Sequence, residues 1–246
     1  AGFEALATSS AGYAFARGQC DGAVGREAMM SHLRDLAAAT VLPISADLEN
    51  GFGDAPDIVG ETIRLAAATG VVGGSIEDAT GRPEEPAYDI GLAKERVQAA
   101  VEMARAAPFA FTLTARAENF LIGRPDLADT IQRLQAYQEA GADVLYAPGV
   151  TSLDDIDTIV RSVDRPVNVV MGLAGAGCDS VALASVGVRR ISVGSALARM
   201  AYGAVVRAAQ EMREHGSFGF ARDAVRSNVL NSLFSVPPQA FETVQS

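Results

Sequence analysis

The sequence predicts an α/β fold, a (β/α)8 TIM-type barrel, from three observations. Short apolar, β-branched segments alternate with amphipathic segments of helical spacing, which is typical of parallel strands joined by helical crossovers. No linker interrupts this alternation, so one continuous domain is expected. The length of 246 residues suits one such barrel, which typically takes about 250. A doubly wound open sheet is the competing architecture.

Seven strands are expected, one fewer than a closed eight-stranded barrel has. They cover residues 4–10, 41–47, 71–78, 109–116, 143–149, 166–172 and 189–195. The chain opens on AGFEAL, which is typical of the end of a helix followed by a strand. We therefore expect the native protein to have a preceding strand and helix that this chain lacks.

Helical segments lie between these strands and carry start and stop signals. Four of them cover residues 56–70, 92–107, 126–141 and 152–163. Glycines that end helices are expected at Gly70, Gly141 and Gly187. Polar side chains that cap helix starts are expected at Asp57, Asp126 and Ser152. The alternation therefore predicts the boundaries of the helices as well as their order.

The end of the chain differs from the barrel pattern. Residues 1–215 are assigned to the barrel and residues 216–246 to a C-terminal helical extension. Within the extension, residues 218–236 have helical spacing and moderate apolarity, and they end at Pro237 and Pro238. We expect this helix to pack on the barrel or on a neighbouring subunit.

Composition excludes several classes of protein. The formal net charge of −10 argues against nucleic acid or an anionic membrane surface as a partner. No apolar run approaches the roughly 20 residues that span a bilayer. Two cysteines are too few for a disulfide framework or a thiolate zinc site, and they predict a cytoplasmic chain. The single lysine, Lys94, lies in a surface helix, so imine chemistry is not expected.

Polar side chains follow the predicted strands, at the face where barrel enzymes place their catalytic groups. They are Thr8, Ser9, Ser10, Asp47, Glu49, Asn50, Glu77, Asp78, Arg116, Glu118, Asn119, Asn168 and Ser195. A single acidic residue after a strand is usually solvated or caps a helix. The prediction of a functional site therefore depends on several of these polar side chains meeting at the same face. Asp47 and Glu77 end apolar strands, where a carboxylate is costly unless it is paired or binds a metal. Oxygen ligands without His or Cys favour Mg²⁺ or Mn²⁺ over zinc.

Four segments in chain order resemble the motifs of the phosphoenolpyruvate mutase/isocitrate lyase superfamily. They are ATSSAGYAFARGQCDG (7–22), ADLENGFG (46–53), GGSIEDAT (73–80) and LTARAENF (113–120). The resemblance extends over about residues 1–200, and its four collinear motifs make it specific. It implies a TIM-type barrel enzyme that needs Mg²⁺ (or Mn²⁺) and binds a small 2-oxo acid. It also implies a homotetramer.

The resemblance implies a role for individual residues. Asp47 would be the direct metal ligand, and Glu49, Glu77 and Asp21 would hold the metal mainly through its waters. Arg116 would bind the substrate carboxylate or oxyanion. The loop that grips the oxo-acid end would consist of Thr8, Ser9, Ser10 and Ala11, with Asn168 as a further carboxylate contact. Arg116, Glu77 and Glu49 are accordingly the expected catalytic residues.

The lid after the third motif departs from both well-known branches of the superfamily. Residues 79–91 contain neither the Lys-(Lys/Arg)-Cys-Gly-His loop of the lyases nor the Lys-Thr-Asn-Ser-like loop of the mutases. Glu84, Glu85 and Tyr88 are the expected proton carriers in this lid, and their alternative role is that of a solvated mobile lid. The sequence therefore does not identify the second half of the substrate.

The expected reaction proceeds through an enolate-like intermediate of a small 2-oxo carboxylate or its aldol-type precursor. A carbon–carbon lyase or decarboxylase is favoured, and a phosphoenolpyruvate/phosphonopyruvate mutase or hydrolase is an alternative. A non-catalytic 2-oxo-acid-binding barrel is another alternative, because the known lid residues are missing. Glycines at 172–177 and 193–197 leave a phosphosugar barrel enzyme as the last alternative.

Overall fold

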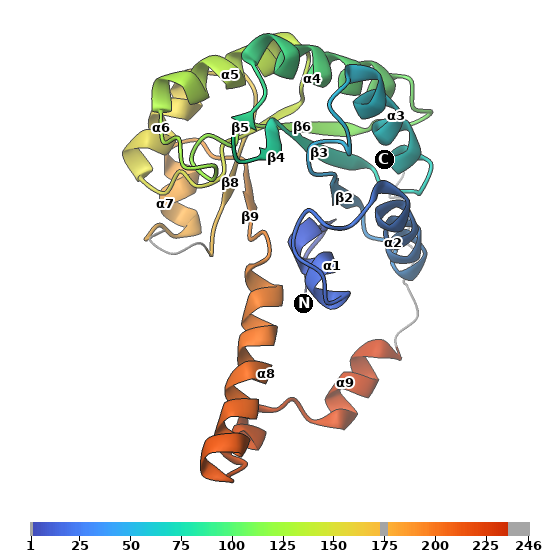
Figure 1. The fold of residues 1–246 in the computed structure, drawn as a ribbon, viewed down its shortest axis with the longest axis vertical. Coiled ribbons are helices and arrows are strands. Elements are labelled where there is room, and N and C mark those ends of the chain that lie inside the picture. The colour runs from blue at the N-terminus through green and yellow to red at the C-terminus, as the bar shows by residue number, and fades with distance from the viewer. Residues whose placement is uncertain (1, 173–176, 236–246) are drawn as a thin grey trace, which may run out of the picture.

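Seven parallel strands form one curved sheet in the computed structural model, which describes residues 2–172 and 177–235. In spatial order they are β1 (Leu6–Ala7), β2 (Ile44–Asp47), β3 (Gly73–Glu77), β6 (Thr112–Arg116), β7 (Val144–Tyr146), β8 (Val167–Val170) and β9 (Arg190–Ser192). This order follows the chain without reversal, whereas a doubly wound sheet reverses at a switch point. The predicted barrel is confirmed, and the nearly closed sheet excludes the open alternative (Figure 1).

The helices that follow the strands cover the outer face of the sheet (Figure 1). They are α2 (Arg26–Ala39), α3 (Pro56–Ala67), α4 (Ile90–Arg105), α5 (Leu127–Glu139), α6 (Leu153–Arg161) and α7 (Ser180–Ser185). The apolar core lies between this layer and the strands and includes Leu33, Ile63, Leu113 and Leu134. Helices α3 and α4 approach closely at Gly60, where a Cβ atom would lie 3.3 Å from the Ala99 carbonyl oxygen.

Most of the predicted helix boundaries are confirmed. Gly70, Gly141 and Gly187 all have the left-handed backbone that favours glycine after a helix. The side chains of Asp126 and Ser152 cap α5 and α6 by accepting backbone N–H bonds. The predicted cap at Asp57 is wrong, because α3 begins at Pro56 and its N-cap residue is Ala55. Proline suits this first helical position, where no N–H partner is needed.

The predicted lid begins with a β-hairpin. Strands β4 (Ala79–Arg82) and β5 (Glu85–Ala87) pair antiparallel outside the barrel sheet. The Thr80 hydroxyl donates to the Glu85 carbonyl and accepts from the backbone N–H of Arg82. The apolar and charged pattern of this segment did not predict these two short strands.

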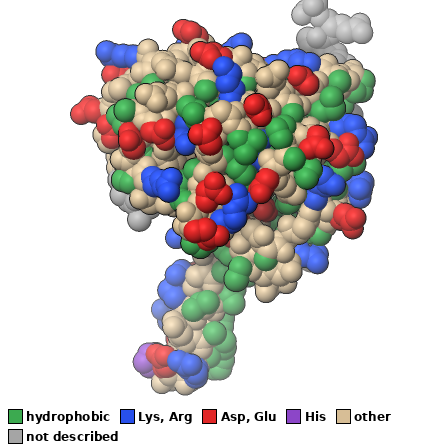
Figure 2. Space-filling model, turned by 45° about the horizontal axis from the view of Figure 1, so that its top comes forward, with side chains coloured by type: hydrophobic (Ala, Val, Ile, Leu, Met, Phe, Trp, Pro, Cys, Tyr) green, Lys and Arg blue, Asp and Glu red, His purple; other side chains and the backbone are tan. Residues whose placement is uncertain are grey.

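Beyond β9, helix α8 (Ala196–His215) extends away from the barrel and α9 (Ser227–Phe234) returns toward it (Figure 1). A short 3-10 helix (Gly219–Asp223) joins them, and the Glu211 carboxylate accepts hydrogen bonds from the connection to it. Large apolar side chains on both helices are exposed, including Leu197, Met200 and Phe234. Figure 2 shows apolar side chains along the part of the molecule that projects from the barrel. Packing of the extension on a neighbouring subunit stays a prediction, and Pro237 and Pro238 lie outside the described residues.

Helix α1 (Ser10–Ala16) begins two residues after β1, so the loop predicted to grip the oxo acid consists of Thr8, the N-cap residue Ser9 and the first turn of a helix. Gly175, one of the glycines on which the phosphosugar alternative partly depends, lies outside the described residues. Among the described residues, no helix combines the length and the apolarity that a membrane crossing requires.

Candidate active site

Asp47, at the end of β2, joins three parts of the predicted site. The Asp47 backbone N–H donates to the Thr8 hydroxyl at 2.8 Å. Its carboxylate accepts from the Ser10 backbone N–H at 3.0 Å and from Arg116 Nη1 at 2.9 Å. The segment between β1 and α1, the end of β2 and the end of β6 therefore meet at Asp47.

Arg116 lies at the centre of a cluster of carboxylates. Its guanidinium contacts Asp47, Glu77 (Nη2–Oε2, 2.9 Å) and Glu118 (Nε–Oε1, 2.8 Å). Burial opposes its charge, but Glu118, Glu77 and Asp47 together raise the Arg116 pKa well above its ordinary value. Because Glu77 and Arg116 are directly paired across β3 and β6, the strand register itself places them side by side.

Glu49 has an unusual backbone and an unsatisfied side chain. Its φ of 52° lies in the left-handed region, and its carbonyl accepts from the Glu77 N–H at 3.0 Å. Among the described residues, its buried Oε1 atom has no hydrogen-bond partner. Burial, with repulsion from Asp47 and Asp21, raises the Glu49 pKa to about 7. A residue with a strained backbone thus holds a carboxylate for which no ion pair is found among the described residues, although the nearby charge of Arg116 lowers its pKa in part.

The remaining predicted residues divide into two groups. Asp21 joins the cluster, because its carboxylate accepts from the Ser10 hydroxyl at 3.2 Å. Ser9 is the N-cap of α1, and Ala11 is buried in its first turn. Asn168 lies two strands from Arg116, with Tyr146 paired between them in the register of β6, β7 and β8.

Asn168 also has unsatisfied hydrogen-bonding capacity. Its Nδ2 donates to the Ser192 hydroxyl at 3.0 Å, while among the described residues its buried Oδ1 has no partner. The Arg116 guanidinium lies 5.3 Å from the centre of the Tyr146 ring. Tyr146 therefore links Asn168 to the arginine cluster along one row of the sheet.

The charges of the cluster fit a hard divalent cation. Three carboxylates pair with Arg116, those of Asp47, Glu77 and Glu118. The carboxylates of Asp21 and Glu49 lie beside them and bring the number of acidic groups in the cluster to five. Within residues 2–172 and 177–235, no group of three or more Asp, Glu, His or Cys side chains is arranged to hold a metal ion. Two of the proposed ligands, Asp47 and Glu77, are instead paired with Arg116. The all-oxygen donor set and the orphaned Glu49 oxygen are what Mg²⁺ or Mn²⁺ would satisfy.

The metal-free protein is expected to lose stability as pH rises from about 5 to about 7. Folded Glu49 keeps its proton up to a pKa of about 7, whereas the unfolded chain releases it near the ordinary value of 4.5. The folded state then binds more protons, so its stability falls as pH rises through this window. Thermal melts with a chelator should show this slope, and Glu49→Gln should flatten it. An unchanged slope in the variant would contradict the assignment.

The sequence did not assign a role to Glu118 or to the buried hydrogen-bond network around it. The Glu118 backbone N–H donates to Asp78 at 2.8 Å, and Asp78 also accepts from Arg133 at 3.0 Å and from the Tyr137 hydroxyl. Glu118 and Asp78 are both nearly fully buried. This network fixes the segment that carries Arg116. The sequence signal that could have identified Glu118 is an acidic residue near the end of an apolar strand, which is the pattern that identified Glu77.

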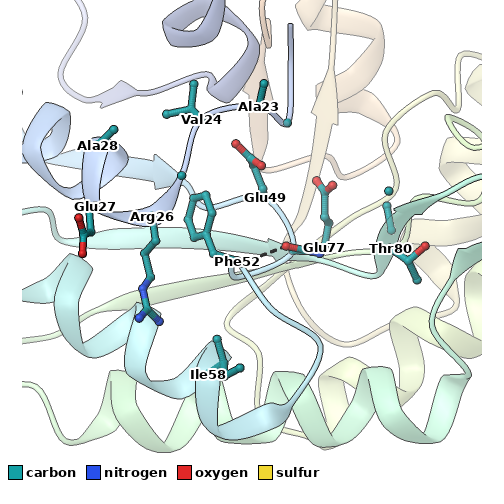
Figure 3. Close-up of a pocket in the computed structure, with 15 residues that line it drawn as sticks. Ala23, Val24, Arg26, Glu27, Ala28, Glu49, Phe52, Ile58, Glu77 and Thr80 are labelled. Atoms are coloured by element: carbon teal, nitrogen blue, oxygen red, sulfur yellow. Dashed lines mark hydrogen bonds between the residues drawn. The ribbon is translucent and has the colours of Figure 1, made fainter. Parts of the chain in front are cut away.

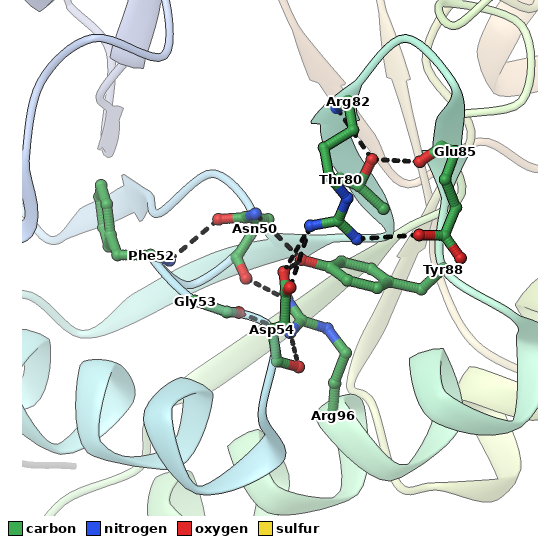
Figure 4. A network of polar contacts seen from close by, with 9 residues as sticks. All are labelled: Asn50, Phe52, Gly53, Asp54, Thr80, Arg82, Glu85, Tyr88 and Arg96. Atoms are coloured by element: carbon green, nitrogen blue, oxygen red, sulfur yellow. Dashed lines mark hydrogen bonds and ion pairs between the residues drawn. The ribbon is translucent and has the colours of Figure 1, made fainter.

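A second unforeseen network joins the lid to the loop that carries Glu49 (Figure 4). Arg96 is buried beneath this loop and donates to the carbonyls of Asn50, Gly53 and Asp54. Its guanidinium stacks on the Tyr88 ring at 3.9 Å. The Tyr88 hydroxyl donates to Asp54 at 2.6 Å. Arg96 thus supports both the strained loop and the base of the lid.

Replacing Arg96 with methionine should lower the free energy of unfolding by about 3 kcal/mol, because three carbonyl oxygens lose their donor. Lysine should restore only part of this stability, since it lacks the planar fork that reaches several acceptors. Urea denaturation measures the change. The control is Arg161→Met, whose side chain is 77% exposed and should be near neutral. A loss for Arg96→Met no larger than for the control would contradict this role.

A pocket of about 900 Å³ opens beside the carboxylates (Figure 3). Its walls come from residues 22–28, from the loop and helix start at 49–58, and from the lid at 79–81, and they include Glu49 and Glu77. The pocket therefore adjoins the cluster on the side of the lid.

Comparison with known proteins assigns the family. The family model of phosphoenolpyruvate phosphomutase matches residues 1–213. The chain belongs to the phosphoenolpyruvate mutase/isocitrate lyase superfamily. Superfamily members are lyases and mutases, so the predicted family and the prediction of an enzyme are confirmed while the reaction stays open.

Individual relatives of this superfamily member agree with the assignment. Oxaloacetate decarboxylase of Pseudomonas aeruginosa is 30% identical over 203 residues, covering 80% of this chain and 67% of that protein. A Burkholderia cenocepacia J2315 structure described as a candidate lyase/mutase is 60% identical, with a TM-score of 0.93, covering 96% of this chain and 85% of that one. The structure of 2,3-dimethylmalate lyase shares the fold at 23% identity and a TM-score of 0.81, covering 94% and 82% of the two chains.

Proposed function

We propose that this protein is a Mg²⁺- or Mn²⁺-dependent enzyme that acts on a small 2-oxo carboxylate or its aldol-type precursor through an enolate-like intermediate. A carbon–carbon lyase or decarboxylase is the proposed reaction class. The observation that carries the proposal is the contact of Asp47 with Thr8, Ser10 and Arg116 within an excess of carboxylates. The similarity to an oxaloacetate decarboxylase supports it.

The metal would be held by Asp47 directly and by Glu49, Glu77 and Asp21 mainly through waters. When bound, the cation would neutralise the excess of carboxylates and stabilise the negative charge that develops on the oxo-acid oxygens. The orphaned oxygen of Glu49 and its raised pKa support a cation at this place.

Arg116 would bind the substrate carboxylate. A guanidinium has five N–H donors, and three of them already contact Asp47, Glu77 and Glu118. The two remaining donors can form charge-assisted hydrogen bonds with the substrate while the three carboxylates hold the group in place. Arg116 would therefore need no reorganisation when negative charge develops.

The segment from Thr8 to the first turn of α1 would bind the oxo-acid end, through Thr8, Ser9, Ser10 and the N–H of Ala11. Asn168 would contribute from β8, and its unpartnered Oδ1 supports a role in binding. Within the lid, the Tyr88 hydroxyl is committed to Asp54, and burial raises its pKa to about 12. Glu85 pairs with Arg82. These contacts favour a lid that excludes water over one whose Tyr88 or Glu85 transfers a proton.

A turnover assay tests the proposal. The full chain with Mg²⁺ should release product from at least one member of a panel of 2-oxo acids, 2-alkylmalates and phosphonopyruvate, and a chelator should stop the reaction. Tight Mg²⁺-dependent binding without product across the panel would instead favour the non-catalytic binding barrel. A homotetramer is part of the proposal, supported by the exposed apolar side chains of α8 and α9.

A further inference from the structure

The pocket beside Glu49 and Glu77 has apolar side chains on two of its walls. Ala23 and Val24 lie on one side and Phe52 and Ile58 on another (Figure 3). The lid contributes Ala79, Thr80 and Gly81. The Thr80 hydroxyl is already used within the hairpin, as donor to the Glu85 carbonyl and as acceptor for the Arg82 N–H. The lid therefore presents little unsatisfied polarity to a ligand.

The arginines around this pocket are committed elsewhere. The Arg26 side chain points away from Glu49 and Glu77 toward α3, where its Nη1 lies 3.4 Å from the buried Thr62 hydroxyl (Figure 3). Arg82, next to the lid wall, pairs with Asp54 at 2.9 Å and with Glu85 at 3.3 Å. Neither guanidinium is placed to face an anion held between Glu49 and Phe52.

The charges of the wall would also repel an anion. Glu27, Glu49 and Glu77 all line the pocket. The charge of a bound cation would be largely offset by the oxo-acid end of the substrate and so would not neutralise these three carboxylates as well. A second carboxylate in the pocket would therefore lose its hydration among like charges, whereas an alkyl group would gain apolar contact with Val24, Phe52 and Ile58.

We infer that this pocket binds the second half of the substrate and that this half is an uncharged alkyl group. The inference rests on the proposed function, because it needs the oxo-acid end to lie at Asp47 and Arg116. It narrows the substrate class to 2-oxo acids, or their aldol-type precursors, that carry an alkyl substituent in place of a second carboxylate. Within the proposed function it selects the carbon–carbon lyase, because a decarboxylase that forms an enolate would need that second carboxylate as its leaving group.

Calorimetric titration of the Mg²⁺-supplemented full chain tests the inference with a matched pair of ligands. 5-Methyl-2-oxohexanoate and 2-oxoglutarate have the same chain, and an isopropyl group in one replaces a carboxylate of similar shape in the other. The alkyl ligand should bind about tenfold more tightly or better. Ala23→Arg places a cation at the exposed edge of the pocket and should shift the preference toward 2-oxoglutarate by at least about tenfold, whereas Ala23→Met has similar length without charge and should not.

Oxalate separates this inference from the function on which it rests, because it fills the oxo-acid end alone. If oxalate binds but 2-oxoglutarate binds as tightly as the alkyl ligand, the inference is overturned and the proposed function stands. If oxalate binds and Ala23→Arg leaves the ratio of the two ligands' affinities unchanged, the ends by which the two ligands differ do not lie in this pocket. The inference is then overturned as well. Absence of oxalate binding would overturn the proposed function itself.

Discussion

Arg116→Ala should weaken binding of oxalate and of any 2-oxo acid by several kcal/mol, about 3 kcal/mol for one buried charge-assisted contact. It should also lower the free energy of unfolding by about 3–5 kcal/mol, because removal of one partner leaves buried charges uncompensated. The charges are those of Asp47, Glu77 and Glu118, whose side chains are 17%, 19% and 4% exposed. Calorimetry and urea denaturation measure the two effects.

Arg116→Lys provides the control for geometry. Lysine keeps one positive charge but has a single nitrogen, which cannot reach three carboxylates and a substrate together. We expect it to recover more of the stability than of the binding. A lysine variant that bound oxalate as tightly as the wild type would show that the forked shape of Arg116 has no part in recognition.

Asp47→Ala should abolish metal-dependent turnover, with a loss on the order of 10³-fold or more, because both the proposed metal ligand and a contact to the substrate loop disappear. Unlike Arg116→Ala, it removes one charge from an excess of carboxylates, so its cost in stability should be smaller. Mn²⁺ affinity, measured by electron paramagnetic resonance, should fall together with activity.

Two controls accompany this prediction. Asp47→Asn keeps the shape of the side chain and should remain inactive, because the charge is what the cation needs. Asp57→Ala removes an exposed carboxylate in the first turn of α3 and should leave turnover unchanged. Full activity of Asp47→Ala without metal would show that the site has been assigned wrongly.

The order of the barrel strands could be predicted from the sequence because each of its units is local. An apolar run such as residues 71–78 can form a buried strand, and Gly70 before it has the left-handed backbone that favours glycine after a helix. Asp57 shows the limit of such signals. An acidic residue near a helix start suits either the cap or the first turn, and Pro56 decides between them.

The candidate site could be predicted only in part, for a related reason. Glu77 and Arg116 end neighbouring parallel strands, so their meeting follows from the topology alone. Arg96 lies in an amphipathic helix, where the sequence indicates only a charged residue. Its burial depends on the lid and the loop folding over it from other parts of the chain. The hairpin of the lid also depends on distant residues. Arg82 in the hairpin donates to Asp54. The backbone of Tyr88, next to the hairpin, accepts from Arg133 and donates to the Asp78 carbonyl.

A crystal structure of the full chain soaked with Mg²⁺ and oxalate tests the central claim most directly. The account predicts a cation at about 2.1 Å from a carboxylate oxygen of Asp47, as octahedral magnesium requires, and oxalate between that cation, Arg116 and the first turn of α1. Waters on the cation should contact Glu49 or Glu77. Oxalate bound instead at the glycine-containing turn of Gly194 and Ser195, with no cation near Asp47, would contradict the account and favour a phosphate-binding barrel.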